Sequence, residues 1–147
     1  DSMGQQPLQQ ATSHLLAQTC KLLRIRAHAS LEEIGLYGGQ QFVLMALWEK
    51  EGIIHSELPE QLHVRPAPIT NALKRMERAG FVERRQDAED QRVSRVYLTD
   101  AGRNIRDAVE GVWRELEERT FAGFSSEERT LLNQFLLRIR NNLMREE

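Results

Sequence analysis

The residues best suited to a chemical role lie in a short charged stretch from Arg84 to Arg92, with the sequence RRQDAEDQR. The stretch separates two β-rich segments, so we expect it to form the tip of a β-hairpin. A purely structural hairpin commonly turns on two residues such as Asn-Gly, whereas this tip is longer, polar and free of glycine. The composition predicts that the tip contacts a charged partner.

The distribution of charge around this stretch indicates what kind of partner that is. The whole chain carries a net charge of −2. Between Arg65 and Arg103, nine Lys and Arg residues outnumber six Asp and Glu residues, which leaves eleven basic and sixteen acidic residues elsewhere. A basic centre in an otherwise acidic chain is expected when one face of the protein meets phosphate groups.

No grouping of residues in the sequence indicates catalysis or metal binding. His14 and His28 lie four turns apart on one predicted helix, about 21 Å at 1.5 Å per residue, so they cannot share a metal. His55 and His63 have no Cys or His at ligand spacing. There is no Gly-rich phosphate loop and no Gly-x-Ser-x-Gly motif. We therefore expect no enzymatic activity, no metal and no cofactor.

The single cysteine, Cys20, excludes an intrachain disulfide and fits a reducing compartment. We expect its side chain to be a small buried group on a helix. The alternative is a redox-sensing thiol with a pKa lowered by Lys21 and Arg24. The sequence contains no run of eighteen apolar residues and no secretory signal layout at its N-terminus, so we predict a cytoplasmic protein that does not enter a membrane.

Two helices are predicted before the basic centre. Residues 8–34 contain no Pro or Gly and repeat apolar residues near helical spacing, which predicts one long helix. Residues 40–52 are predicted to form the second helix, with Phe42, Met45 and Leu47/Trp48 expected on its buried side.

Two shorter helices joined by a tight turn follow, the first around Leu58 and Leu62 and the second from Pro66 to Gly80. Prolines in a first helical turn cost little, because the N–H groups there have no helical partner. The residues expected to form the buried stripe of the second helix are Ile69, Leu73 and Met76. This arrangement is a helix-turn-helix.

After Gly80 the hydrophobic period changes from 3.6 to 2, which predicts two strands around a wing at 86–92. Thr99 is expected to cap a long helix over 100–122. Ser125 and Glu128 form a capping-box pattern that opens the last helix.

The terminal helices carry more apolar surface than one small core can cover. On the last helix this surface comprises Leu132, Phe135, Leu136, Ile139 and Leu143. Burying each such side chain contributes roughly 1.5–3 kcal/mol of stability relative to leaving it in water. We predict a two-fold homodimer, with folding back inside one monomer as the alternative. The expected organisation is a dimerisation helix over 5–36, a helix-turn-helix and hairpin lobe over 37–99 and dimerisation helices over 100–147.

The stretch from 38 to 103 resembles the MarR (multiple antibiotic resistance regulator) family of winged-helix transcription factors. The most specific parts are RMERAGFVERR at 75–85, the Asp-x-Arg of Asp90 and Arg92, and Leu98-Thr99 followed by Gly102. The resemblance implies a mostly α fold with a small β-hairpin wing. It also implies a dimer that places the Pro66–Gly80 helix in the major groove of DNA and the wing in the adjacent minor groove.

The residue types on the predicted recognition helix agree with that role. Asn71 suits a bidentate contact to adenine, and Thr70 can reach a base or a phosphate. Lys74 and Arg75 suit backbone contacts, which set register and affinity. Ala67 also lies off the buried stripe.

On the wing, Arg92 suits a narrow A·T-rich minor groove, whose negative potential attracts arginine. Asp90 is expected to pair with an arginine and hold the shape of the wing. Arg65 stands where the family prefers a small N-capping residue, and we expect it to grip phosphate instead. The predicted DNA-binding residues are Arg65, Pro66, Ala67, Thr70, Asn71, Lys74, Arg75, Arg84, Asp90 and Arg92.

The function predicted from these observations is a dimeric, sequence-specific regulator that binds double-stranded DNA as an effector-responsive repressor at a pseudo-palindromic operator. The resemblance implies a small aromatic or lipophilic effector. Arg24, His28, Phe42 and Trp48 are candidates to line its site, although core packing also explains Phe42 and Trp48. The alternatives are a module that binds an acidic protein, and a redox or metal sensor on the same scaffold.

Overall fold

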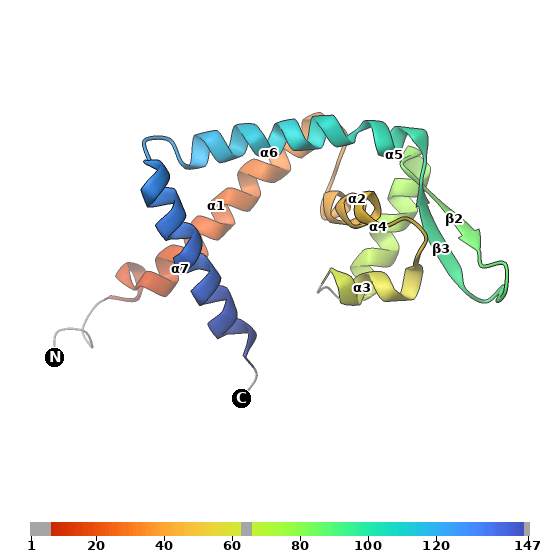
Figure 1. Ribbon diagram of the computed structural model, residues 1–147, viewed down its shortest axis with the longest axis horizontal. Helices are drawn as coiled ribbons and strands as arrows, with labels where there is room; N and C mark the ends of the chain where they lie inside the picture. The colour runs from red at the N-terminus through yellow and green to blue at the C-terminus, as the bar shows by residue number, and fades with distance from the viewer. Residues whose placement is uncertain (1–6, 63–65, 146–147) are drawn as a thin grey trace. The chain divides into compact units, whose positions relative to one another are not determined.

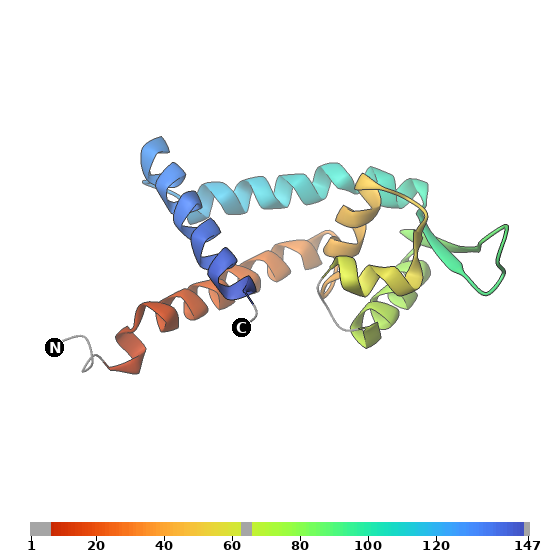
Figure 2. The same ribbon diagram turned by 60° about the horizontal axis from the view of Figure 1, so that its bottom comes forward.

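The computed structural model describes residues 7–62 and 66–145. The chain divides into two compact units, one that runs up to Trp113 and one that begins at Arg114. Figures 1 and 2 show that most of the chain is helical and that the strands belong to the first unit. The predicted fold class, mostly α with a small hairpin wing, is confirmed.

The elements follow in a simple order. A 3₁₀ turn and two helices come first: η2 (Leu8–Gln10), α1 (Thr12–Glu33) and α2 (Gln40–Glu49). The centre comprises β1 (Ile53–Ile54), η3 (His55–Glu57), α3 (Leu58–Gln61), α4 (Pro66–Ala79), β2 (Val82–Gln86) and β3 (Ser94–Leu98). The last elements are α5 (Asp100–Asn104), α6 (Arg106–Thr120), which crosses the unit boundary, and α7 (Ser126–Met144).

Within the described residues, the strands form one antiparallel sheet in the order β1-β3-β2. The hairpin register pairs Val82 with Leu98, Arg84 with Val96 and Gln86 with Ser94. Because side chains alternate along a strand, Val82 and Arg84 share the face of the sheet that carries the buried Val96.

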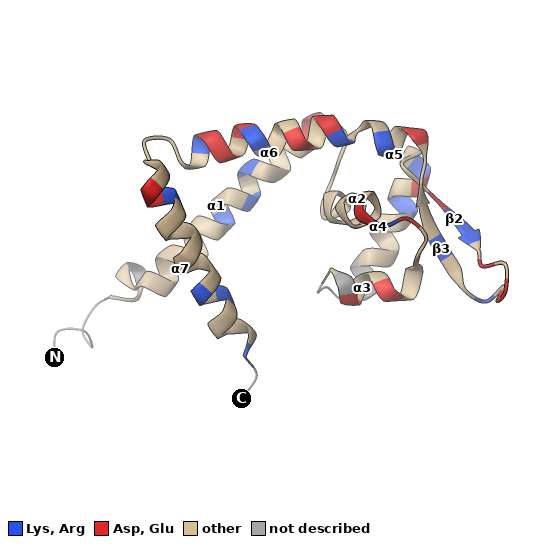
Figure 3. Ribbon diagram, in the orientation of Figure 1, with Lys and Arg blue, Asp and Glu red and all other residues tan. Residues whose placement is uncertain are grey.

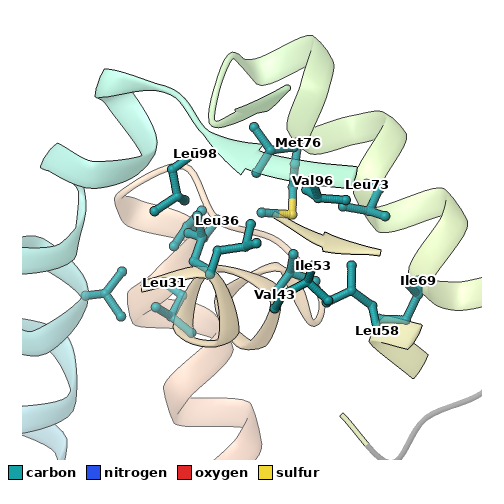
Figure 4. Packing of buried hydrophobic residues seen from close by; sticks show 14 residues of the cluster. Leu31, Leu36, Val43, Ile53, Leu58, Ile69, Leu73, Met76, Val96 and Leu98 are labelled. Atoms are coloured by element: carbon teal, nitrogen blue, oxygen red, sulfur yellow. The ribbon is translucent and has the colours of Figure 1, made fainter. Parts of the chain in front are cut away.

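The core of the first unit lies between this sheet face, α2, α4 and the end of α1. Leu31, Leu36 and Val43 belong to one buried cluster, and Figure 4 shows Leu73 and Met76 of the same cluster beside Val96. The predicted stripe on α4 is confirmed, since Ile69, Leu73 and Met76 are all buried.

The predicted buried side of α2 is wrong for Phe42 and Met45, while Leu47 is buried and Trp48 partly buried as predicted. Phe42 and Met45 are 48% and 46% exposed, while Val43, Leu44 and Leu47 are buried. This helix is apolar on almost every side, so the spacing of its apolar residues could not single out one face.

The helix predicted over 100–122 is divided at Ile105 into α5 and α6. The indole N–H of Trp48 donates to the Gly102 carbonyl at 2.9 Å. In a continuous helix that carbonyl would accept the N–H of Arg106, four residues further on. The tertiary hydrogen bond therefore competes with the helical one where the helix breaks.

Gly102 itself is a site of close approach. A Cβ at this position would lie 2.2 Å from the Phe81 carbonyl oxygen and 3.0 Å from the Leu98 side chain. Thr99 caps α5 as predicted, since its hydroxyl accepts the Gly102 N–H at 3.2 Å.

In the second unit, α7 begins with the predicted capping box. Ser125 Oγ accepts the Glu128 N–H at 3.1 Å, and Glu128 Oε1 accepts the Ser125 N–H at 2.9 Å. Its apolar residues are largely exposed, among them Leu131, Phe135 and Leu143.

Two further observations bear on the predicted class of protein. Cys20 is exposed on α1, so the expectation of a buried thiol is wrong. Among the helices of the described part of the chain, none combines the length and the apolar character needed to cross a bilayer.

Candidate nucleic-acid interface

The helix α4 presents a polar face opposite its buried stripe. Asn71, Lys74 and Arg75 are exposed on that face, and Thr70 is half-buried. Arg78 is exposed on the same side one turn further on and extends the basic row, since residues three and four apart are neighbours on a helix. Arg78 is absent from the predicted set, although the same spacing argument could have found it.

The first residues of the predicted site are described only in part. Arg65 lies outside the described residues. Pro66 and Ala67 have helical backbone at the start of α4, and their side chains are not described. The side chains of the predicted set can therefore be placed from Thr70 onward.

The wing between β2 and β3 contains no glycine, and aspartate side chains stabilise its turn by accepting hydrogen bonds from backbone N–H groups. Asp90 N–H donates to Asp87 Oδ2 at 3.1 Å, and Arg92 N–H donates to Asp90 Oδ1 at 3.0 Å. Backbone bonds from Asp87 to Val93 (2.9 Å) and from Val93 to Asp90 (3.0 Å) complete the loop. Aspartate side chains commonly stabilise turns in this way.

The expected pairing of Asp90 with an arginine is present. Arg92 Nε lies 3.2 Å from Asp90 Oδ1, while the Arg92 side chain is 92% exposed. A pair this exposed is easily exchanged for another anion, because water screens it. Figure 3 shows both signs of charge along the hairpin.

A second ion pair at the base of the wing escaped prediction. Arg95 Nε donates to Asp87 Oδ1 at 2.8 Å, and Arg95 Nη1 donates to the Gly52 carbonyl at 2.8 Å. The hydrogen bond from Arg95 lowers the pKa of the Asp87 carboxyl. Eight residues separate the pair, so only the hairpin register brings them together.

Arg84 differs from the other predicted contacts because its side chain turns toward the protein. Its Nε lies 2.6 Å from Glu77 Oε1 on α4, and its Nη1 lies 3.3 Å from Nδ1 of His55 on η3. Burial and then the Arg84 guanidinium lower the pKa of His55, against an opposing effect of Glu77. Arg85, on the other sheet face, stacks over the Tyr97 ring at 4.3 Å.

The structure brings the recognition helix and the wing to one shallow hollow. Thr70 of α4 and Arg92 of the wing both line a space of about 490 Å³, together with His55 and Ser94. These side chains can donate hydrogen bonds to phosphate or base edges.

The candidate effector residues are not gathered in one place. Phe42 lines a hollow of about 490 Å³ with Met45 and Leu62. Trp48 lines another of about 330 Å³ with Arg106 and Trp113. Arg24 and His28 are exposed on α1 and line neither of these two hollows.

In residues 7–62 and 66–145, no group of three or more carboxylate, imidazole or thiol side chains is placed to hold a metal ion.

Comparison with known proteins connects this geometry to a family. Residues 36–94 match the family model described as "MarR family". The chain is 31% identical over 116 residues to the HTH-type transcriptional regulator YwoH of Bacillus subtilis, covering 79% of this chain and 84% of that protein.

A second relative and a solved structure support the same family. The transcriptional regulator HosA of Escherichia coli is 31% identical over 102 residues, which cover 69% of this chain and 76% of HosA. A crystal structure of MarR superimposes with a TM-score of 0.78 at 28% identity, covering 91% of this chain and 98% of that one. The chain therefore belongs to the MarR family of winged-helix, DNA-binding transcriptional regulators.

Proposed function

We propose that this regulator acts as a cytoplasmic homodimeric repressor that binds a pseudo-palindromic operator and has no enzymatic activity. One observation carries the proposal: Thr70 of α4 and the exposed Arg92 of the wing line the same hollow. A recognition helix and a wing that flank one hollow are suited to adjacent grooves of one duplex.

Within that interface each residue has a distinct role. Asn71 contacts adenine in the major groove, and Thr70 contacts a base or a phosphate. Lys74, Arg75 and Arg65 contact the sugar–phosphate backbone.

The first turn of α4, with Pro66 and Ala67, approaches the bases closely because its residues carry short side chains. On the wing, Arg92 enters the minor groove, where narrow A·T-rich sequence concentrates negative potential. Asp90 holds the Arg92 backbone N–H and its Nε, and so positions the contact.

Dimerisation places two such interfaces on one duplex. The exposed apolar residues of α1 and α7 supply the surface, among them Leu15, Leu22, Phe135 and Leu143. Residues 5–36 and 100–147 form the dimerisation helices and 37–99 the DNA-binding lobe. A two-fold dimer recognises half-sites about one helical turn (~34 Å) apart.

Regulation by a small aromatic or lipophilic molecule follows if that ligand prefers the dimer geometry that does not fit DNA. The hollow between Trp48 and Trp113 also contains Met45 and Val109, and this apolar lining suits a lipophilic or aromatic ligand. Its charged residues are Arg106, Glu49 and Glu110, and Arg106 Nε pairs with Glu110 Oε1 at 3.0 Å, so an acidic ligand would have to displace Glu110. A ligand with equal affinity for both geometries would change nothing.

The test is selection of duplexes from a random pool, followed by fluorescence anisotropy at several salt concentrations. We expect a selected pseudo-palindrome and an affinity that falls steeply as salt rises, since phosphate contacts release counterions. Failure to select any duplex, or a salt-independent affinity, would refute the proposal. Recovery of an acidic protein partner without duplex binding would favour the interaction-module alternative.

The effector is tested by repeating the anisotropy measurement with a panel of aromatic acids. At least one member should lower the affinity of the wild-type protein for its selected duplex. If none does, the regulator remains but its response to this class of ligand is excluded.

A further inference from the structure

We propose that Arg84 is a positioning residue that ties the recognition helix to the wing through Glu77, and that it does not contact DNA itself. This inference rests on the proposed function and reassigns one residue of the predicted interface.

The first support is the direction of the Arg84 side chain. Arg84 is two residues after the buried Val82 and pairs with the buried Val96 on β3. Its side chain therefore leaves the sheet on the inner face, toward α4, whereas the Arg85 side chain leaves on the outer face over Tyr97. The wing tip, where Arg92 is exposed, lies further along the hairpin.

The second support is the state of the partner carboxylate. Glu77 Oε1 is shielded from solvent and receives no well-aligned hydrogen bond from the residues that the structure describes. Arg84 Nε lies 2.6 Å from this oxygen, and the two side chains are only 32% and 31% exposed. A shielded carboxylate oxygen is costly without a nearby cation. If Arg84 moved away to contact a phosphate, the shielded Glu77 oxygen would lose the cation beside it.

The third support is that the guanidinium joins three elements. Arg84 Nη1 lies 3.3 Å from Nδ1 of His55, which is on η3, while Glu77 belongs to α4 and Arg84 to β2. A neutral imidazole can accept this hydrogen bond at Nδ1.

The ion pair adds a directional contact to the apolar packing of Leu73 and Met76 of α4 in one cluster with Val82 of β2. The connection between α4 and β2 is a short turn at Gly80, which has a positive φ of 83°. The recognition helix and the wing must reach two different grooves at once. A small change in their angle therefore weakens binding without removing any contact to DNA.

The decisive experiment is a charge exchange. Glu77→Arg and Arg84→Glu are made singly and together in the full-length protein, and affinity for the selected duplex is measured by anisotropy. We expect each single variant to bind about tenfold more weakly or worse. The double variant keeps the net charge and can form the reversed pair, so it should recover most of the affinity.

The matched control is the corresponding exchange at Glu83 and Arg85. These two residues form an ion pair on the outer sheet face, where the Arg85 side chain is 58% exposed. Reversing that pair should change the affinity much less than the single Glu77 or Arg84 variants do.

A conservative variant covers the case in which the reversed pair fails to fold. Arg84→Gln should weaken binding while the slope of affinity against salt stays that of the wild type. Loss of a phosphate contact would instead lower the slope by about one unit. A lowered slope for Arg84→Gln, or a folded double variant that binds as weakly as Arg84→Glu, overturns the inference. If the wild type selects no duplex, the proposed function fails instead.

Discussion

Asp87 and Arg95 close the base of the wing from opposite sides of the hairpin, with Arg95 Nε donating to Asp87 Oδ1 at 2.8 Å. The same guanidinium donates to the carbonyl of Gly52, directly before β1, so it also anchors the wing to the start of β1. The tip is held differently, because among the described residues Arg92 is tethered to its neighbour Asp90 and its side chain is 92% exposed. The wing thus combines a braced base with a tip that can exchange its partner for phosphate.

The brace at the base should make a pH-dependent contribution to stability. The hydrogen bond from Arg95 lowers the pKa of Asp87 below its usual value of 3.8. A carboxyl whose pKa is lower in the native state than in the unfolded state stabilises the fold at pH values above its unfolded-state pKa. This stabilisation is lost as the pH falls through the native-state pKa. Asp87→Asn should therefore lower the melting temperature at neutral pH, and the difference should shrink below about pH 4. Thermal unfolding over a pH series measures it, with Glu89→Gln as the control in the same loop. A difference that persists unchanged at low pH would contradict this account.

Arg92→Ala should weaken operator binding and lower the salt slope by about one unit. The melting temperature should hardly change, because the side chain is 92% exposed. Anisotropy at several salt concentrations gives the slope, and Arg114→Ala, outside the interface, is the control. If the minor groove is the target, replacing A·T pairs there by G·C should affect the wild type more than the variant.

Asn71→Ala and Lys74→Ala should separate base recognition from backbone contact. Asn71→Ala should relax the preference at one base pair, worth about 1–3 kcal/mol of discrimination. Lys74→Ala should weaken binding to all sequences to a similar degree. Repeating the duplex selection with each variant checks the pair. An unchanged sequence preference for Asn71→Ala would remove Asn71 from the base contacts.

How far the sequence predicts this structure depends on how local the cause of each feature is. The α4 stripe, the Thr99 cap and the Ser125–Glu128 capping box arise from neighbouring residues, and all three are present as predicted. The break at Ile105 coincides with a hydrogen bond to Gly102 from Trp48, more than fifty residues earlier, and local periodicity gives no sign of that contact.

The site follows the same rule. The exposed row on α4 and the Asp90–Arg92 pair could be predicted from spacing alone. The partner of Arg84 could not, because Glu77 lies on a different element and Arg84 resembles any other arginine of the basic centre. Alternation along β2 does place Arg84 on the inner sheet face, which was the available signal.

Gly102→Ala should be strongly destabilising. The added Cβ would lie 2.2 Å from the Phe81 carbonyl oxygen, so backbone must shift. Overpacking of this kind typically costs about 1–3 kcal/mol. Gly111→Ala in α6 is the matched control, because its Cβ meets nothing within 4 Å. Since Ala favours helix, Gly111→Ala should stabilise by about 0.5–1 kcal/mol. Denaturant unfolding of both variants tests the contrast, and equal effects would contradict it.

Phe135→Asp should disrupt the dimer and with it operator binding. Phe135 is half-exposed on α7 among other exposed apolar residues, including Leu131 and Leu136. A carboxylate buried in an apolar interface has no partner there, so the monomer becomes the favoured state. Sedimentation velocity should show a shift from dimer to monomer, and affinity for a two-half-site duplex should fall far more than affinity for a single half-site. Gln134→Asp places the same charge one residue away as the control. A Phe135→Asp protein that remained dimeric would move the interface off this face of α7.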